Sequence, residues 1–404
     1  MTPDTPEPRT PAALGSRVLM ALIVGQLGLH AAMAGLRMAT PLQALRLGAS
    51  AWTVGVLLAL FAAAPVLLAL HAGRLADRLG YHRPVRIAAA LALAGMGAAV
   101  ASVWMTGWAS GWWTLGALCL AATLTGSAAN LGMLTIQRTA GLAARDATER
   151  MRIFSWLGVA PSFSNVVGPV AAGLMIDATG FAGAYLLLMA LPLATLASAR
   201  LVPVLAPNPS ARSGGRTAWD LLGAPGMKRL LAVNWLFSMC WDVHAFAVPV
   251  LGHERGFSAS TIGFILGTFT LAVTGIRLLV PLLAHRIEEV KVLGGAMVGT
   301  AVVFAAYPFA ANPWLMAGCA ALLGLTLGVA QPIIMTTLHQ VTPEGRHGES
   351  LAFRSMAINA SSTLMPLVFG ALGSAAGAAV LFWSVGGLVG SGAWLTRRIA
   401  RIRT

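Results

Sequence analysis

The sequence predicts an all-α membrane protein with twelve transmembrane helices in two pseudo-symmetric six-helix bundles. Of its 404 residues, 57% are hydrophobic and 10% are charged, and the mean hydropathy is +0.77. A soluble chain of this size could not cover its surface with so few charges. Long apolar runs recur along the chain, each near the roughly 20 residues that a helix needs to cross a bilayer. Parts of the first half also recur in the second half.

Each long apolar run is interpreted as a helix, because only a helix satisfies its own backbone in lipid. The spans expected in the first half are 18–39, 52–70, 87–105, 113–136, 153–176 and 182–199. Those expected in the second half are 230–249, 261–283, 292–310, 313–338, 351–372 and 378–395. The expected domains are an N-tail (1–17), a bundle (18–199), a linker (200–229), a second bundle (230–395) and a C-tail (396–404). The linker is rich in Pro, Ser, Gly and Arg, as flexible connections are.

The basic residues lie between the apolar runs and predict the orientation. If the N-tail is cytoplasmic, 23 of the 27 Lys and Arg residues fall in cytoplasmic segments. The positive-inside rule then places both termini in the cytoplasm. The net charge of +14 is explained in this way without a nucleic-acid partner. Low Lys and high Ala and Arg contents suggest a bacterial inner-membrane protein. We expect a monomer whose partners are a small solute and membrane lipid.

An internal repeat relates the two halves. At an offset of 208, six residues around Gly48 match six around Gly256. The same offset places Gln26, His30 and Ala34 on Asn234, Ser238 and Asp242, and Arg37 continues the first series. A spacing of four puts each trio on one helical face. Because polar side chains in a membrane face the protein interior or a watery cavity, both helices are predicted to line a central cavity.

A second register relates the later helices. At an offset of 197, Ser162 and Asn165 match Asn359 and Ser362, and at 201, Asn130 matches Gln331. Parallel halves with polar residues near the membrane midplane are typical of transporters that work by alternating access.

Residues 73–83 read Gly-Arg-Leu-Ala-Asp-Arg-Leu-Gly-Tyr-His-Arg. This closely resembles the loop signature of the major facilitator superfamily, although Tyr81 and His82 stand where a basic residue is usual. The resemblance implies a transporter with a latch that holds its cytoplasmic side closed, formed by Gly73, Asp77, Arg78, Gly80 and Arg83. Glycines permit a tight turn, and an aspartate can bond a helix N-terminus or an arginine. The alternative is a plain solvated turn.

Gly168, Pro169 and Gly173 resemble an exporter-associated signature of the same superfamily, except that its paired glycines are missing. The resemblance implies efflux. Alternatively, these residues only allow close helix packing and a bend.

Asp242 is the only acidic residue that we place deep in a helix. It is a candidate for proton coupling or substrate binding, or one half of a static ion pair. The repeat puts Asp242 level with Ala34, about 4.5 Å along the helix axis from Arg37, which predicts an Arg37–Asp242 ion pair. His30 is a candidate proton relay or substrate contact. Arg277 either pairs with groups of the helices at 313–338 and 351–372 or snorkels to the interface. His244, two residues from Asp242, is expected to point away from the cavity in a structural role.

The sequence contains no enzyme signature and no phosphate-binding loop, which argues against an ATP-driven pump. Its three cysteines lie in apolar stretches without a metal-ligand pattern, so no metal or other cofactor is expected. The leading hypothesis is a secondary active transporter that moves a small organic solute by alternating access, as a proton-driven antiporter in efflux. The alternatives are an uptake symporter for an organic anion, bound by Arg37 and Arg277, and a non-transporting membrane sensor.

Overall fold

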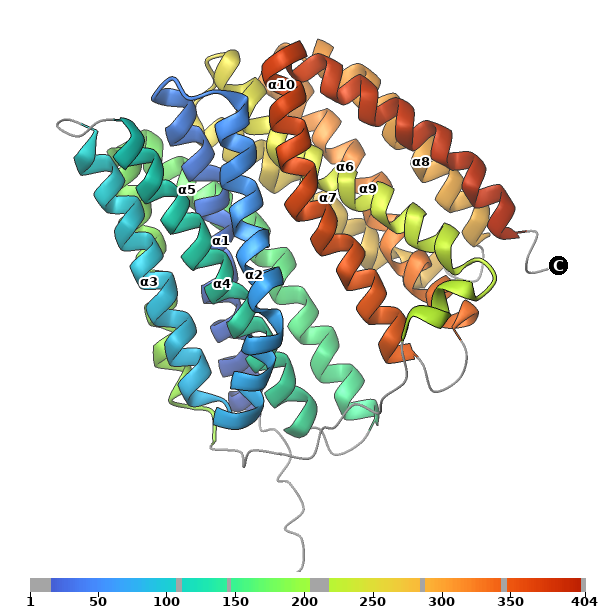
Figure 1. Ribbon diagram of the computed structural model, residues 1–404, viewed down its shortest axis with the longest axis horizontal. Helices are drawn as coiled ribbons and strands as arrows, with labels where there is room; N and C mark the ends of the chain where they lie inside the picture. The colour runs from blue at the N-terminus through green and yellow to red at the C-terminus, as the bar shows by residue number, and fades with distance from the viewer. Residues whose placement is uncertain are drawn as a thin grey trace, which may run out of the picture.

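The structure is a computed structural model, and it describes residues 16–106, 111–143, 147–203, 218–283, 288–342 and 347–400, apart from some side chains within these ranges. Over the described residues it forms ten long helices and two short 3-10 helices, without strands (Figure 1). All ten long helices are long and apolar enough to cross a membrane. In chain order, the elements are α1 (Ser16–Arg46), α2 (Ala51–Leu79), α3 (His82–Met105), α4 (Gly111–Ala143), α5 (Ala147–Ala199), η1 (Ala218–Gly223), α6 (Met227–Glu254), α7 (Ala259–Leu283), α8 (Glu289–Ala306), η3 (Tyr307–Phe309), α9 (Pro313–Val341) and α10 (His347–Ala400).

Two of the helices, α5 and α10, are about twice as long as one membrane crossing needs, with 53 and 54 residues. Each contains one glycine with non-helical backbone angles: Gly180 at φ 79° and Gly377 at φ 83°. A positive φ suits glycine because it has no Cβ. In Figure 1, α10 rises to the top of the view and returns downward beyond its kink. The described residues therefore form ten long helical elements rather than the twelve separate helices expected, because in α5 and in α10 two helical stretches meet at a single kinked glycine.

The helices also extend beyond their apolar runs, which corrects the expected boundaries. The signature expected in a loop lies mostly in helices: residues 73–79 end α2, and His82 and Arg83 begin α3. Only Gly80 and Tyr81 connect the two helices, and Gly80 has φ 69°. Hydropathy misses such helix ends because they are polar and extend past the hydrocarbon.

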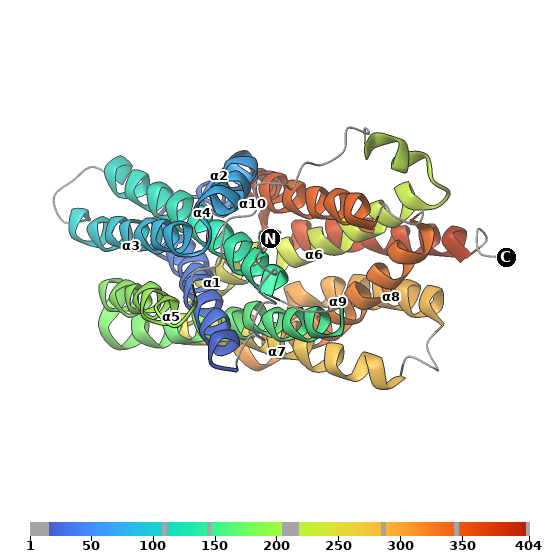
Figure 2. The ribbon, with the colours of Figure 1, turned by 90° about the horizontal axis from the view of Figure 1, so that it is seen from below.

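The first and second halves of the chain lie side by side, with α2 next to α10 and α5 next to α7 (Figure 2). The first helix of each half is the most enclosed. In the most apolar stretches of α1 and α6, 56% and 72% of residues are buried, compared with 28% in α5 and α10. The helices with the two predicted polar series are therefore the central ones.

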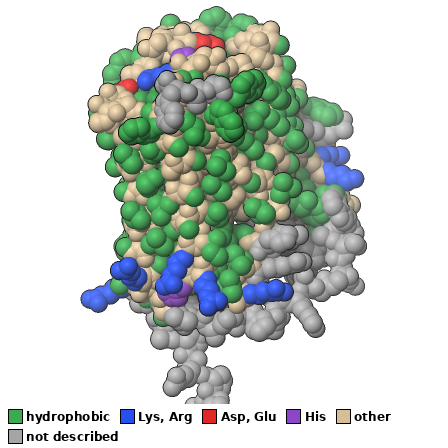
Figure 3. All heavy atoms as spheres, turned by 60° about the vertical axis from the view of Figure 1, so that its left-hand side comes forward, with side chains coloured by type: hydrophobic (Ala, Val, Ile, Leu, Met, Phe, Trp, Pro, Cys, Tyr) green, Lys and Arg blue, Asp and Glu red, His purple; other side chains and the backbone are tan. Residues whose placement is uncertain are grey.

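The two ends of the bundle differ in charge. We call the end of the bundle that contains the α2–α3 connection the basic end. The opposite end, which contains the turns at Gly48 and Gly256, is called the far end. Figure 3 shows one face of the molecule, where Lys, Arg and His side chains gather at the lower end below a broad apolar surface. This distribution matches a protein whose apolar belt lies in lipid.

The halves meet in two pseudo-equivalent seams of backbone contact. A Cβ added to Gly55 of α2 would collide with the carbonyl oxygen of Pro366 in α10, and one added to Gly263 of α7 would collide with that of Pro169 in α5. The two glycines are 208 residues apart and the two prolines 197 apart, so both registers of the repeat are present in space. Gly173 packs in the same way against Ala259 of α7. Pro169 and Gly173 of the predicted motif therefore lie in the seam, whereas Gly168 packs against Ala31 of α1 in its own half.

We expect Gly263→Ala to lower the melting temperature of the purified protein, since the new methyl group meets backbone atoms of α5. Overpacking of this kind typically costs about 1–3 kcal/mol. The matched control is Gly275→Ala in the same helix, where a Cβ has no neighbour within 4 Å. A thermal-unfolding measurement in detergent compares them. Equal melting temperatures for the two variants would contradict the close seam.

Candidate functional site: an ion pair between the two halves

The centre of the site is an ion pair between α1 and α6. Arg37 Nη2 lies 3.7 Å from Asp242 Oδ1, so the ion pair predicted from the repeat is present. The Asp242 side chain is only 3% exposed, and that of Arg37 is 25% exposed. Because 3.7 Å is longer than a hydrogen bond, the two groups interact by Coulomb attraction rather than by a directed bond. This attraction joins the two halves of the chain.

A third helix, α10, completes the surroundings of the Asp242 carboxylate. Ser361 Oγ donates to Oδ2 at 2.7 Å, and Ser362 Oγ donates to Oδ1 at 3.1 Å. The sequence predicts Ser362 as a cavity residue but does not single out Ser361. The repeat offers a signal for Ser361, because its counterpart at an offset of 197 is Ser164, another buried serine in α5. Both carboxylate oxygens are therefore held by hydroxyl groups while Arg37 lies alongside.

Arg37 keeps hydrogen-bond donors free beside a cavity. Its Nε and Nη2 are buried and have no hydrogen-bond partner among the described residues. A buried donor without a partner costs about 1–3 kcal/mol, so a ligand or water that accepts from it is favoured. The adjoining cavity of about 60 Å³ lies between four helices and is lined by Ala34, Arg37, Met38, Asn165, Pro169, Trp241, His244, Ala245, Leu266, Phe269 and Thr270.

Asn165 and His244 both line this cavity, but the sequence predicts only Asn165 there. Asn165 is predicted as a cavity residue and lines the cavity. His244 is expected to point away, yet it lines the same cavity as Arg37, stacks on Phe269 at 4.3 Å between ring centroids and lies 3.2 Å from the Tyr307 hydroxyl. The prediction for His244 rests on its helical spacing from Asp242. It is wrong because α7 also packs against the face of α6 that carries His244 and encloses that face.

The polar series continues from the ion pair toward the basic end. Gln26 and Asn234, which correspond in the repeat, are 2% and 0% exposed, and neither amide has a hydrogen-bond partner among the described residues. Each lies eight residues before Ala34 or Asp242, about 12 Å along its helix. His30 is half-buried between Gln26 and Arg37. Ser238 donates to the carbonyl of Asn234 in its own helix, at 3.0 Å.

A second cationic cluster lies in the C-terminal half. Arg277 of α7 has no acidic partner among the described residues, and its buried Nε is unpartnered. The group that acts on it electrostatically is another cation, Arg354 of α10. Arg354 donates a hydrogen bond to Gln331 Oε1 of α9. Arg277 thus faces the helices that the sequence indicates, but it meets a like charge there.

The remaining predicted residues are not brought to the ion pair. Asn130 donates to the carbonyl of Pro65 at 3.4 Å, within the first half. Ser162 is half-buried and Asn359 is exposed. The side chain of Asp77 lies outside the described part of the structure, as does the side-chain position at Gly73, so the latch stays a prediction. Among the described residues, no three His, Cys, Asp or Glu side chains are grouped to hold a metal ion.

Asp177 makes a contact at the far end that the sequence does not predict. Asp177, near the kink of α5, accepts hydrogen bonds from the backbone N–H groups of Ala259 at 3.0 Å and Ser260 at 2.7 Å, in the first turn of α7. A carboxylate suits a helix N-terminus, where backbone N–H groups lack partners and the helix dipole is positive. Asp177 therefore caps a helix of the opposite half and reinforces the seam at this end.

Comparisons with known proteins agree with this architecture. Among solved structures, the chain is similar to a POT family transporter in complex with a thioalcohol-conjugated peptide, at 12% identity and a TM-score of 0.74, covering 93% of this chain and 94% of that one. It is similar to a bacterial homologue of the iron transporter ferroportin in an inward-facing state, at 17% identity and a TM-score of 0.73, covering 95% and 98%. A D-xylose–proton symporter matches at 14% identity and a TM-score of 0.70, covering 94% and 96%. At these identities the likeness shows the fold alone.

No curated protein sequence matches the chain significantly. A family model, in contrast, matches almost its whole length. The model described as Major Facilitator Superfamily matches residues 22–231 and again 230–402, so each half of the repeat is covered. Together with the two seams and the buried ion pair between the halves, this match identifies the chain as a member of the Major Facilitator Superfamily.

Proposed function

We propose that the chain is a secondary active transporter that exports a small organic solute by alternating access, in exchange for protons. The observation that carries this proposal is the Arg37–Asp242 ion pair, because it joins the two halves and borders a cavity between them. A group that both ties the halves together and changes its charge with a proton can link proton movement to their separation.

The proposed coupling step uses only this pair and the groups around it. When a proton forms an O–H bond on the Asp242 carboxylate, the attraction to Arg37 disappears and the two halves lose one tie. While the pair is intact, the Nε of Arg37, which is unpartnered among the described residues, can bind a carbonyl or anionic group of the solute from the cytoplasmic side. Proton uptake from the outer side then breaks the pair and displaces the solute, and release of that proton to the cytoplasm restores the pair, so that a proton enters as a solute leaves. His30 lies two helical turns from Arg37 on the same face, where it could pass the proton onward.

The proposed topology follows from the kinks and the charges. We infer that α5 and α10 each cross the membrane twice, giving twelve crossings in two bundles of six, at residues 18–199 and 230–395, joined by the linker 200–229. The basic end then faces the cytoplasm together with the tails 1–17 and 396–404, as the positive-inside rule requires. We propose a monomer in the inner membrane of a bacterium. The export direction rests on the resemblance of Gly168, Pro169 and Gly173 to an exporter signature.

A second candidate function is uptake of an organic anion with protons. Arg277 and Arg354 favour it, because the charge of Arg354 acts on Arg277 and neither has an acidic partner among the described residues. Together with the unpartnered donors of Arg37, they make the interior cationic. An anionic solute would relieve the repulsion between the two guanidinium groups, which provides binding free energy without a new structural element.

Transport by purified protein in liposomes is the direct test of the proposed function. A thermal-shift screen of metabolites and drugs first finds a ligand, since a ligand that binds the folded state raises the melting temperature. We then expect uphill movement of that ligand to depend on a proton gradient and to stop with a protonophore, whereas Asp242→Asn liposomes show none. The sign of the accompanying pH change separates proton exchange from symport. Binding without flux would identify a sensor and overturn the proposal.

Substitutions at the ion pair test its role. Arg37→Ala and Asp242→Ala should each lower stability by about 3–5 kcal/mol, because one buried charge is left uncompensated. The double variant should lose less than the sum of the two, which a double-mutant cycle of unfolding free energies measures. An interaction energy of zero would show that the 3.7 Å contact has no energetic role.

The charge-exchanged protein, Arg37→Asp with Asp242→Arg, separates a strut from a proton site. The exchange restores the attraction, so part of the stability should return. If Asp242 is the proton site, proton-coupled transport stays lost, since the carboxylate has moved away from Ser361 and Ser362. Recovery of coupled transport as well as stability would show that the pair is only a strut.

Asp177 at the far end is tested by hydrogen exchange. Asp177→Ala removes the acceptor of the Ala259 and Ser260 N–H groups, and the loss of such a cap costs about 0.5–2 kcal/mol. We therefore expect the amides at the start of α7 to exchange roughly 2- to 30-fold faster, measured by mass spectrometry. Glu254→Ala, which removes an exposed acid next to the same turn, is the matched control. Unchanged exchange in Asp177→Ala would exclude the cap.

A further inference from the structure

We propose that a groove at the basic end, between the start of α3 and the end of α5, binds the phosphate headgroup of an anionic phospholipid. This groove encloses about 1010 Å³, far more than the cavity beside the ion pair, and it lies away from that cavity. The proposal is independent of the proposed function, since it concerns the surface that faces lipid rather than the interior.

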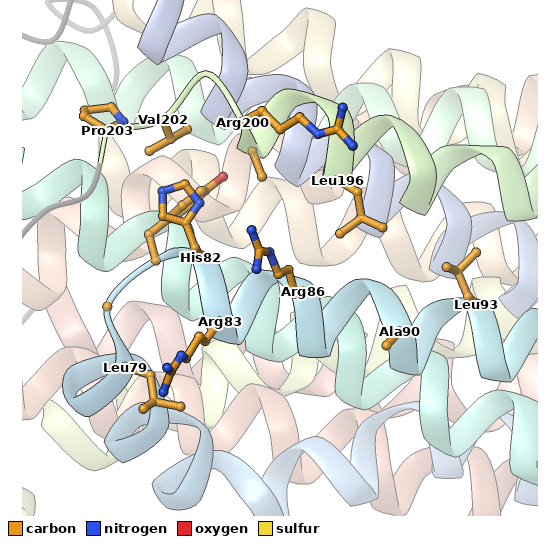
Figure 4. A pocket seen from close by; sticks show the side chains of 13 residues that line it. Leu79, His82, Arg83, Arg86, Ala90, Leu93, Leu196, Arg200, Val202 and Pro203 are labelled. Atoms are coloured by element: carbon orange, nitrogen blue, oxygen red, sulfur yellow. The ribbon is translucent and has the colours of Figure 1, made fainter.

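One end of the groove is basic. His82, Arg83 and Arg86 come from the first two turns of α3, and Arg200 directly follows α5. Figure 4 shows His82 and Arg86 rising from α3 toward the side of Arg200, while Arg83 points to the other side of α3. The groove therefore brings together basic side chains from the start of α3 and from the residue that follows α5, and the α3 N-terminus adds the positive end of its dipole.

Arg86 and Arg200 lack counter-charges in the described part of the protein. No ion pair joins the side chain of His82, Arg86 or Arg200 to another described residue, whereas Lys291 and Glu288, also exposed, do pair, at 2.7 Å. The segment that continues from the groove, residues 204–217, contains Arg212 and Arg216 and no acidic residue. Residues 204–217 therefore supply no counter-charge to Arg86 and Arg200, and an external anion would.

The position of His82 is set by a buried neighbour. Tyr81 is 3% exposed and packs edge-on against the imidazole, with ring centroids 5.3 Å apart. Burial raises the pKa of the Tyr81 phenol, so this hydroxyl stays neutral and adds no negative charge to the groove. The basic rim is therefore backed by a buried, uncharged side chain.

The rest of the groove is apolar, which selects a lipid over a free phosphate. Ala90 and Leu93 of α3 and Leu196 of α5 line it, and Figure 4 shows them along the helices beyond the basic side chains. Figure 3 shows one face of the molecule on which basic side chains lie at the end of an apolar surface. A phospholipid matches both parts, since its phosphate meets the arginines and its acyl chain lies on the leucines. A soluble phosphate would use only the rim.

Lipid binding to the delipidated full-length protein tests the proposal. Native mass spectrometry or titration with phosphatidylglycerol and phosphatidylcholine should show tighter binding of the anionic lipid. Each basic residue near an anionic group contributes about a factor of five in affinity, so Arg86→Gln with Arg200→Gln should weaken phosphatidylglycerol binding roughly 30-fold. Phosphatidylcholine binding should not change.

Two further variants keep the result interpretable. Arg17→Gln removes an exposed arginine at the start of α1, outside the groove, and should leave phosphatidylglycerol binding intact. Arg86→Lys with Arg200→Lys keeps both charges and should retain most of the affinity, which excludes misfolding as the cause of a loss. Equal losses in Arg17→Gln would show diffuse surface charge and overturn the proposal. Glycerol phosphate binding as tightly as phosphatidylglycerol would assign the groove to a soluble anion instead.

Discussion

The arrangement of this protein depends on the attraction between Arg37 and Asp242 across the interface of its two halves. Neither charge would be stable alone among buried apolar side chains, and each one compensates the other. At 3.7 Å the attraction needs no exact geometry, so it tolerates small movements of α1 against α6. The serine hydroxyls of α10 bind the carboxylate more tightly, at 2.7 and 3.1 Å. Asp242 is thus anchored within the C-terminal half, and its partner in the N-terminal half is the contact that can break.

Pseudo-symmetry explains most of the packing, and its exceptions carry the polar chemistry. The seams at Gly55 and Gly263 are equivalent, since each glycine meets a proline carbonyl of the facing helix. Asp242, in contrast, corresponds to Ala34. Likewise Asp177 corresponds to Ser374, which donates to a carbonyl of its own helix instead of capping the facing one. Within the described structure, the Asp177 cap is therefore found in the α5–α7 seam and not in the equivalent α2–α10 seam. The central carboxylate, Asp242, belongs to the C-terminal half alone.

In the described interior between the ion pair and the basic end, several buried polar groups lack the hydrogen bonds that would stabilise the fold. Gln26, Asn234 and Arg37 have buried polar atoms without partners in the described structure, although most buried polar groups in proteins are bonded. A fully satisfied interior would be more stable, but it would present nothing to a passing solute. The same reasoning applies to Arg277 and Arg354, whose repulsion an anionic solute would relieve. Stability and binding thus make opposite demands on these side chains.

The sequence by itself determined where the apolar helices run, the repeat and the central ion pair, but not the number or the ends of the helices. Hydropathy shows where a chain can cross lipid, and a repeat transfers positions from one half to the other, so the meeting of Arg37 with Asp242 follows from the order of residues alone. Tertiary structure alone decided the contacts of Ser361, Asp177 and His244, the meeting of Arg277 with Arg354, and the basic groove between α3 and α5. Helical periodicity tells which face of a helix is polar, but not which helix packs against that face. Those contacts depend on how the halves pack, which is set by glycines and backbone carbonyls that carry no hydrophobic or charge signal.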